Sequence, residues 1–220
     1  MFGKLRVGGS HHNEFSVEKR RGYYLYKRGS TSVKLVSKKL ELEVRPMAPV
    51  NLPDRVTDFF IVSYPKLHIA PGERIITFLK VPLEVGVFFQ NELVDVFGYA
   101  KEEFVLYGYV DGGTVARRVG GEVVEEPIKW DGASMVIPLR IKNYTDEIFK
   151  ASKLLLDSSY LDIYYDNKRV ATEMVKLDLR KVVAPRVRYL NRSHFKDMTR
   201  VRARGQVLKK EETIEMGWGV

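Results

Sequence analysis

YLDIYYDNKRVATEMVKLDL, residues 160–179, carries the clearest structural signal in this chain of 220 residues. Apolar and polar side chains alternate over 161–165, which is the period-two pattern of a β-strand. Asp166 and Asn167 are turn-forming residues, and the largely apolar run 170–179 follows them. The segment therefore predicts two antiparallel strands joined by a tight turn.

The same period of two recurs along most of the chain, whereas helical periodicity is scarce. Pro82 lies inside one apolar segment, and a proline within a strand indicates a sheet edge or a bulge. Many short strands separated by Gly/Pro turns predict an all-β protein with an antiparallel, sandwich-like architecture. Further strands are expected at 32–44, 74–89, 102–119 (two strands around a turn at 111–113), 135–143, 186–190 and 199–208.

The expected exception to this pattern is one short helix. Residues 146–157 begin with two acidic residues, and Thr145 before them can act as the helix N-cap. A second break in the pattern, EEPIKWDG (125–132), separates the β segments into two groups. We therefore expect two β halves, an N-terminal β-rich domain over 1–128 and a C-terminal sandwich-like domain with basic strands over 129–220.

Composition excludes several classes of protein. At 45% hydrophobic residues the chain is too apolar to be disordered, and the absence of cysteine excludes disulfides and thiolate metal sites. The first residues lack the apolar core of a signal peptide, and no apolar run reaches the ~20 residues of a membrane helix. Charged residues make up 30% of the chain and glutamine is rare, a balance typical of thermophile proteins. We expect a soluble cytoplasmic protein from a thermophilic archaeon or bacterium.

The net charge of +9 is distributed unevenly. Residues 1–45 hold 11 basic and 4 acidic side chains, a net charge of +7, and residues 180–210 hold 11 and 1, a net charge of +10. The segment between them is mildly acidic. This asymmetry indicates a polyanionic partner or contact between the parts of the chain.

Two segments carry a resemblance to a known family. They are YPKLHIAPGERIITFLKVPLEVGVFF (64–89) and IPLRIKNYTDEIFKASKLLLDSSYLDIYYDNKRVATEMVKLDL (137–179). Together they resemble an archaeal family of roughly this length that has no assigned function. The resemblance covers most of the chain and supports an archaeal source and a β-rich fold. It implies no activity and no site residues.

A basic stretch near the C-terminus, TRVRARG (199–205), places arginines at alternate positions, so in a strand their side chains share one face. Such a row can follow the phosphates of a nucleic acid, with a nearby tyrosine stacking on a base. We favour a simpler interpretation, in which Glu211, Glu212 and Glu215 form cross-strand ion pairs with the row. The candidate nucleic-acid-binding residues are Arg186, Arg188, Arg192, Arg200, Arg202, Arg204 and Tyr189.

A second basic segment, RRGYYLYKRG (20–29), interleaves basic and aromatic residues, as proteins that bind single-stranded RNA do. It departs from the RRM signature, since Tyr24 stands where that signature needs glycine or alanine. We favour a plain strand with Tyr24 and Tyr26 on one face and Tyr23 and Leu25 on the other.

The sequence motifs give little support for metal binding or catalysis. The weak candidates for a metal site are His11, His12 and Glu14, and in a strand the two histidines would point to opposite faces. The sequence contains no HExxH, GxSxG or P-loop motif. We expect no cofactor.

These observations predict a non-catalytic binding or assembly module of unknown biochemical role, acting on a protein partner or on a second copy of itself. The first alternative is a nucleic-acid-binding protein that uses the basic segment 180–210. The second is a hydrolase-type enzyme with carboxylate or histidine side chains in a β cleft. An exposed apolar patch, a continuous basic face and a concave pocket with titratable side chains would distinguish these three.

Overall fold

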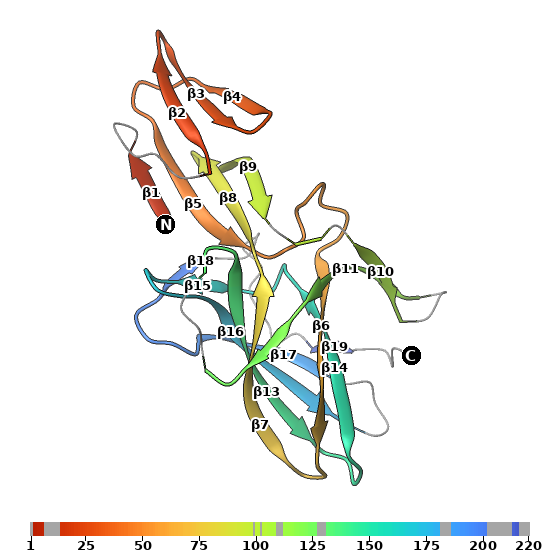
Figure 1. The fold of residues 1–220 in the computed structure, drawn as a ribbon. Coiled ribbons are helices and arrows are strands. Elements are labelled where there is room, and N and C mark those ends of the chain that lie inside the picture. Colours follow the sequence, from red (N-terminus) through yellow and green to blue (C-terminus); the bar gives the residue numbers. More distant parts are fainter. Residues whose placement is uncertain are drawn as a thin grey trace.

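The computed structural model describes residues 2–6, 14–98, 100, 101, 103–108, 112–126, 131–180, 186–201 and 213–215. In this part of the chain every regular element is a β-strand, and the strands form four sheets (Figure 1). The predicted all-β class is therefore confirmed. The same residues include no helix long and apolar enough to cross a membrane.

The largest sheet, here called the large sheet, contains the predicted hairpin 160–179. Its strands β15 and β16 pair antiparallel, with Ile163 opposite Thr172 and Tyr165 opposite Val170. In order, the sheet comprises β12 (Glu122–Val124), β7 (Arg74–Pro82), β13 (Ser134–Asn143), β16 (Val170–Leu179), β15 (Ile163–Tyr165) and β18 (Thr199–Val201). β17 (Arg186–Ser193) pairs with the later part of β16, and β19 (Thr213–Glu215) pairs with β17.

A second sheet, here called the flanking sheet, corrects the predicted helix at 146–157. Residues Phe149–Asp157 form strand β14, which pairs antiparallel with β6. Leu154, Leu155 and Leu156 are all buried, so both faces of the strand are covered, and a short apolar run of this kind resembles a helix by periodicity. The sheet has the order β10 (Phe104–Tyr107), β11 (Thr114–Gly120), β6 (Phe59–Ile69) and β14.

Two corners connect the large and flanking sheets. β6 leads into β7 and β13 leads into β14, and each corner passes from one sheet to the other (Figure 1). The buried amide of Asn143 links the corners, because its Nδ2 donates to the carbonyls of Ile69 (2.9 Å) and Glu147 (2.8 Å). Its Oδ1 accepts from the backbone N–H of Thr145, which therefore stabilises a turn and does not cap a helix.

The large and flanking sheets both contain strands from either side of residue 128. β7 pairs with β13 from Ser134–Pro82 to Lys142–Arg74, and β6 pairs with β14 in the same way. The division into domains 1–128 and 129–220 stays a prediction, and the pairing shows that the two halves share their sheets.

Prolines lie where a sheet tolerates a missing N–H. Pro138 lies in the register shift between β13 and β16, and Pro65 lies in the shift between β6 and β14. Pro82 is the last residue of β7, beyond the stretch of that strand that β12 covers. The expected strand 74–89 therefore divides at Leu83, and its second half joins a different sheet.

The remaining strands form two smaller sheets at the other end of the molecule (Figure 1). The upper sheet has the order β1 (Gly3–Arg6), β5 (Glu41–Met47), β8 (Glu84–Phe89) and β9 (Glu92–Gly98), all antiparallel. The meander consists of β2 (Ser16–Arg20), β3 (Tyr23–Arg28) and β4 (Thr31–Leu35). The expected strand 32–44 thus divides between the meander and the upper sheet.

The meander attaches to the upper sheet through Asp95. Tyr26 Oη donates to this carboxylate at 2.6 Å, and Arg28 donates from Nε at 2.6 Å and from a terminal nitrogen at 2.9 Å. Tyr24 and Tyr26 are buried on one face of β3, as predicted, while Tyr23 and Leu25 are half-buried. Side chains of the basic, aromatic segment 20–29 therefore pack and form hydrogen bonds within the protein.

Because of this attachment, we expect the free energy of unfolding to fall at acid pH. Burial raises the pKa of Asp95, but the hydrogen bonds from Arg28 and Tyr26 outweigh that effect, and its pKa lies below the usual value. The stabilisation from Asp95 is complete above the pKa that this side chain has in the unfolded protein, about 3.9. It is lost as the pH falls through the lower pKa that Asp95 has in the folded protein. In urea denaturation we expect Asp95→Asn to be less stable at neutral pH and to lose less stability between about pH 4 and pH 2. The exposed Asp54→Asn is the matched control, and parallel acid profiles for wild type and Asp95→Asn would contradict this role.

Candidate functional site

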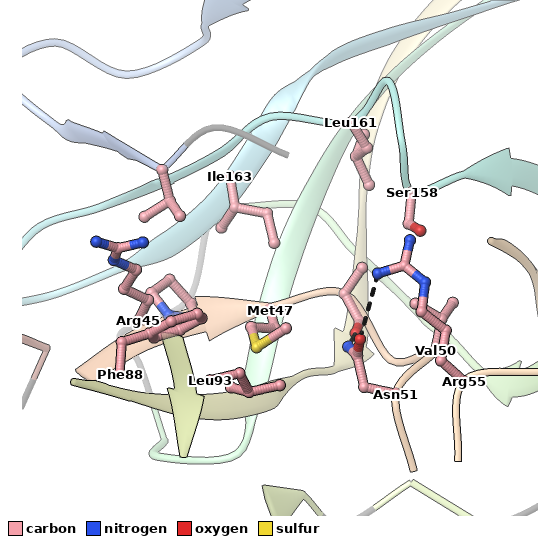
Figure 2. A pocket seen from close by; sticks show the side chains of 13 residues that line it. Arg45, Met47, Val50, Asn51, Arg55, Phe88, Leu93, Ser158, Leu161 and Ile163 are labelled. Carbon is pink, nitrogen blue, oxygen red and sulfur yellow. Dashed lines mark hydrogen bonds between the residues drawn. The ribbon is translucent and has the colours of Figure 1, made fainter. Parts of the chain in front are cut away.

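A pocket lies where the upper sheet meets the edge of the large sheet (Figure 2). Its volume is about 120 Å³, and apolar side chains form most of its wall. β5, the loop that follows it, β8 and β9 contribute one side, while the β14–β15 connection, β15 and β18 contribute the other. The apolar lining residues are Pro46, Met47, Ala48, Val50, Phe88, Leu93, Leu161, Ile163 and Val201, and the polar ones are Arg45, Asn51, Arg55 and Ser158.

Strand alternation explains which side chains reach the pocket. Leu161 and Ile163 line it, while Asp162 between them is buried and forms an ion pair with Arg200. On the opposite wall, Gly86 leaves space for two lining residues. A Cβ at this position would lie 2.4 Å from the sulfur of Met47 and 2.7 Å from the ring of Phe88. The pocket therefore depends on a glycine that is not itself part of its surface.

One end of the pocket holds Arg55 and Ser158, and both contact Asp58. Arg55 Nε donates to the Asp58 carboxylate at 2.7 Å, and the backbone N–H of Ser158 donates to the Asp58 carbonyl at 2.8 Å. A terminal nitrogen of Arg55 donates to the same Asp58 oxygen, and the other terminal nitrogen donates to Asn51 Oδ1 at 3.5 Å, at the limit for such a bond. Ser158 Oγ is buried and has no hydrogen-bond partner, and a buried hydroxyl without one is uncommon.

The opposite end holds Arg45, whose side chain is already engaged. One terminal nitrogen donates to Glu43 at 2.6 Å and to Asn91 at 3.0 Å, and the guanidinium lies 4.6 Å from the centre of the Phe88 ring. The hydrogen bond to Glu43 raises the pKa of Arg45, and in return it lowers the pKa of Glu43. Figure 2 shows Arg45 and Arg55 at opposite ends of the apolar wall.

A fully buried ion pair supports the wall beside Asn51. Arg117 on β11 and Glu84 on β8 are both 0% exposed, and Arg117 NH1 donates to the Glu84 carboxylate. The carboxylate also accepts from the backbone N–H of Asn51 at 2.8 Å and from that of Leu52 at 3.3 Å. Gly98 permits this arrangement, because a Cβ there would lie 2.9 Å from Glu84 Cγ. The pair thus joins the flanking sheet, the upper sheet and the loop that lines the pocket.

The candidate nucleic-acid residues are not gathered into one free row. Arg188 forms an ion pair with Asp178, and Arg200 forms one with Asp162. Tyr189 is 4% exposed, and its hydroxyl accepts from the backbone N–H of Asp157 at 2.8 Å. Arg192 is exposed on β17, Arg186 lies opposite Glu215 in the β17–β19 register, and Arg202 and Arg204 lie outside the described residues. Nucleic-acid binding by this set stays a prediction.

Of the weak metal candidates, the structure describes Glu14 alone. Glu14 is exposed, and His11 and His12 lie outside the part of the chain that the structure describes. Within that part there is no group of three or more His, Cys, Asp or Glu side chains able to hold a metal ion.

The sequence reasoning missed the pocket and the buried ion pair. The pocket could not be found, since its walls come from five separate stretches of chain. The ion pair had a signal in TVARRVG (114–120), where Arg117 shares the strand face of Val115 and Val119. A charged residue at an apolar register position indicates a buried partner.

Breaking the buried pair should cost far more stability than a surface ion pair. Arg117→Met leaves the Glu84 carboxylate buried without its cation, so we expect a loss of about 3–5 kcal/mol in the free energy of unfolding. Glu84→Gln should also destabilise, and the double variant should lose less than the sum of the single losses. Urea denaturation of all four proteins measures this coupling. Arg118→Met, which breaks an exposed ion pair to Glu103, is the matched control. Strictly additive losses would show that the pair does not act as a unit.

Comparison with known proteins identifies the family of the chain but assigns it no function. Residues 1–216 match the family model described as "Protein of unknown function (DUF432)". No curated protein and no solved structure matches the chain. The resemblance to an uncharacterised family is therefore confirmed over nearly the whole length, and the chain belongs to the DUF432 family of proteins of unknown function.

Proposed function

We propose that this protein is a non-catalytic binding module that holds a small ligand in the pocket between the upper and large sheets. The observation that carries the proposal is an apolar pocket of about 120 Å³ with polar side chains confined to its ends. Ligand sites in proteins are concave, mostly apolar and provided with a few polar groups that set orientation. They also occur preferentially where structural units meet, as this pocket does.

The pocket chemistry favours binding over catalysis. No carboxylate, imidazole or amine is among the lining side chains that the structure describes. Ser158 is the one hydroxyl there, and its Oγ has no hydrogen bond to a base that could activate it. The buried carboxylates of Asp162 and Glu173 do not line the pocket. Asp162 pairs with Arg200, and Glu173 accepts from the backbone N–H groups of Asp162 and Asn191. A hydrolase is therefore the weaker alternative.

Methyl NMR with a small apolar probe tests the proposal. Benzyl alcohol should shift the methyl resonances of Val50, Leu161 and Ile163 and bind with a Kd of about 1 mM or tighter. Leu93→Trp enlarges a half-buried lining residue and should abolish these shifts while the protein stays folded. Ile76→Trp, at an exposed position away from the pocket, is the matched control. Unmoved pocket methyls at saturating probe, or shifts centred elsewhere, would reject the pocket as the binding site.

Assembly is a second candidate function, favoured by an apolar patch at a sheet edge. β10 is an edge strand of the flanking sheet among the described strands. Leu106 on β10 lies opposite Val115 on β11, and their exposed fractions are 49% and 45%. Exposed apolar side chains that are neighbours indicate an interaction surface more strongly than scattered ones.

A second copy of the chain is the partner we propose for this edge, because sheet edges pair with like edges. We expect concentration-dependent dimerisation in analytical ultracentrifugation and its loss in Leu106→Lys, whereas Val36→Lys, at an exposed site in the loop that follows β4, should not affect it. A protein that stays monomeric at high micromolar concentration would remove this candidate and leave the pocket unaffected.

A further inference from the structure

The two ends of the pocket differ in what they offer a ligand, and this difference identifies a ligand class. At the Arg45 end one terminal nitrogen of the guanidinium donates to Glu43 and Asn91, and the guanidinium stacks on Phe88. At the Arg55 end the buried hydroxyl of Ser158 has no hydrogen-bond partner. The ligand orientation should therefore be set at the Arg55 end.

The unused capacity at the Arg55 end consists of hydrogen-bond donors. Arg55 directs Nε and NH2 to a single oxygen of Asp58, which leaves NH1 with only the 3.5 Å contact to Asn51. Ser158 is 8% exposed, and its Oγ is buried and has no hydrogen-bond partner. Figure 2 shows Ser158 and the Arg55 guanidinium at the same end of the pocket. A ligand that binds here must supply acceptor atoms.

A carboxylate is the acceptor group that fits this pair of donors. Its two oxygens can accept one hydrogen bond from a guanidinium and one from a hydroxyl, and charge-assisted bonds of this kind are among the strongest in proteins. A doubly charged phosphate fits less well, because Asp58 already neutralises much of the Arg55 charge. At the opposite end Arg45 is paired with Glu43, and none of the described polar atoms lining that end is buried without a partner, so we place the charged group of the ligand at the Arg55 end.

The remainder of the ligand must be compact and apolar. A cavity of about 150 Å³ accommodates benzene, and this pocket of about 120 Å³ is close to that size. Met47, Phe88 and Ile163 form its wall beyond the polar end. Resting on the proposed binding function, we propose that the pocket binds a small monocarboxylate with an aromatic or branched apolar body, its carboxylate held by Arg55 and Ser158.

Matched probes separate the ligand class from the binding function. Isothermal titration calorimetry with benzoate and benzamide compares the same ring with a charged and a neutral polar group. We expect benzoate to bind at least about tenfold more tightly, which corresponds to about 1.4 kcal/mol. Equal binding of both probes would overturn the carboxylate proposal and leave the pocket as a binding site. Absence of binding for both would overturn the proposed function as well.

Variants at the two ends test the orientation. Arg55→Gln should remove the preference for benzoate, whereas Arg45→Gln should retain it. Ser158→Ala should weaken benzoate binding a few-fold without lowering the melting temperature, because the hydroxyl has no partner to lose. Asp58→Asn keeps an amide oxygen that can accept from Arg55 but removes the competing negative charge, so it should tighten benzoate binding. A gain of affinity cannot arise from unfolding. A preference that depends on Arg45 and not on Arg55 would overturn the proposed orientation.

Discussion

The buried ion pair between Arg117 and Glu84 is the interaction on which the arrangement of the sheets depends. Two charges removed from water are costly unless each is compensated, and here the compensation comes from three parts of the chain. Glu84 accepts from Arg117 and from the backbone of Asn51 and Leu52, while Arg117 also donates to the carbonyl of Ala100 at 3.2 Å. The flanking sheet, the upper sheet and the loop between them must therefore be correctly placed together. An ion pair of this kind specifies one arrangement more than it adds net stability.

The pocket follows from the way these parts meet. A continuous apolar core includes residues of every sheet, so the layers pack closely over most of their contact. Where the upper sheet meets the edge of the large sheet, Gly86 gives Met47 and Phe88 the room they occupy in the pocket wall, and Ser158 contributes only a small side chain. The two guanidinium groups at this junction are held by ion pairs, Arg55 with Asp58 and Arg45 with Glu43. Such pre-organisation lowers the entropic cost of binding a ligand.

The local pattern of apolar and polar residues predicted much of the fold and little of the candidate site. The hairpin 160–179 and the buried face of Tyr24 and Tyr26 followed from alternation alone. The segment around Leu155 was predicted as a helix and is a strand, because a strand buried on both faces has no alternation to display. Pairing between β6 and β14 brings together segments about ninety residues apart, and no local signal specifies such a contact. The pocket combines five stretches in this way, so neither Arg55 nor Ser158 stood out.

The most direct measurement is a set of intermolecular NOEs between benzoate and the methyl-labelled protein in solution. We expect contacts from the ring protons to Met47 and Ile163, with the ortho protons nearest the Arg55 end of the pocket. We also expect the Arg117 guanidinium to stay protected from solvent exchange, since the buried pair with Glu84 does not line the pocket. NOEs to residues outside the pocket, or none to Ile163 at saturating benzoate, would contradict the account.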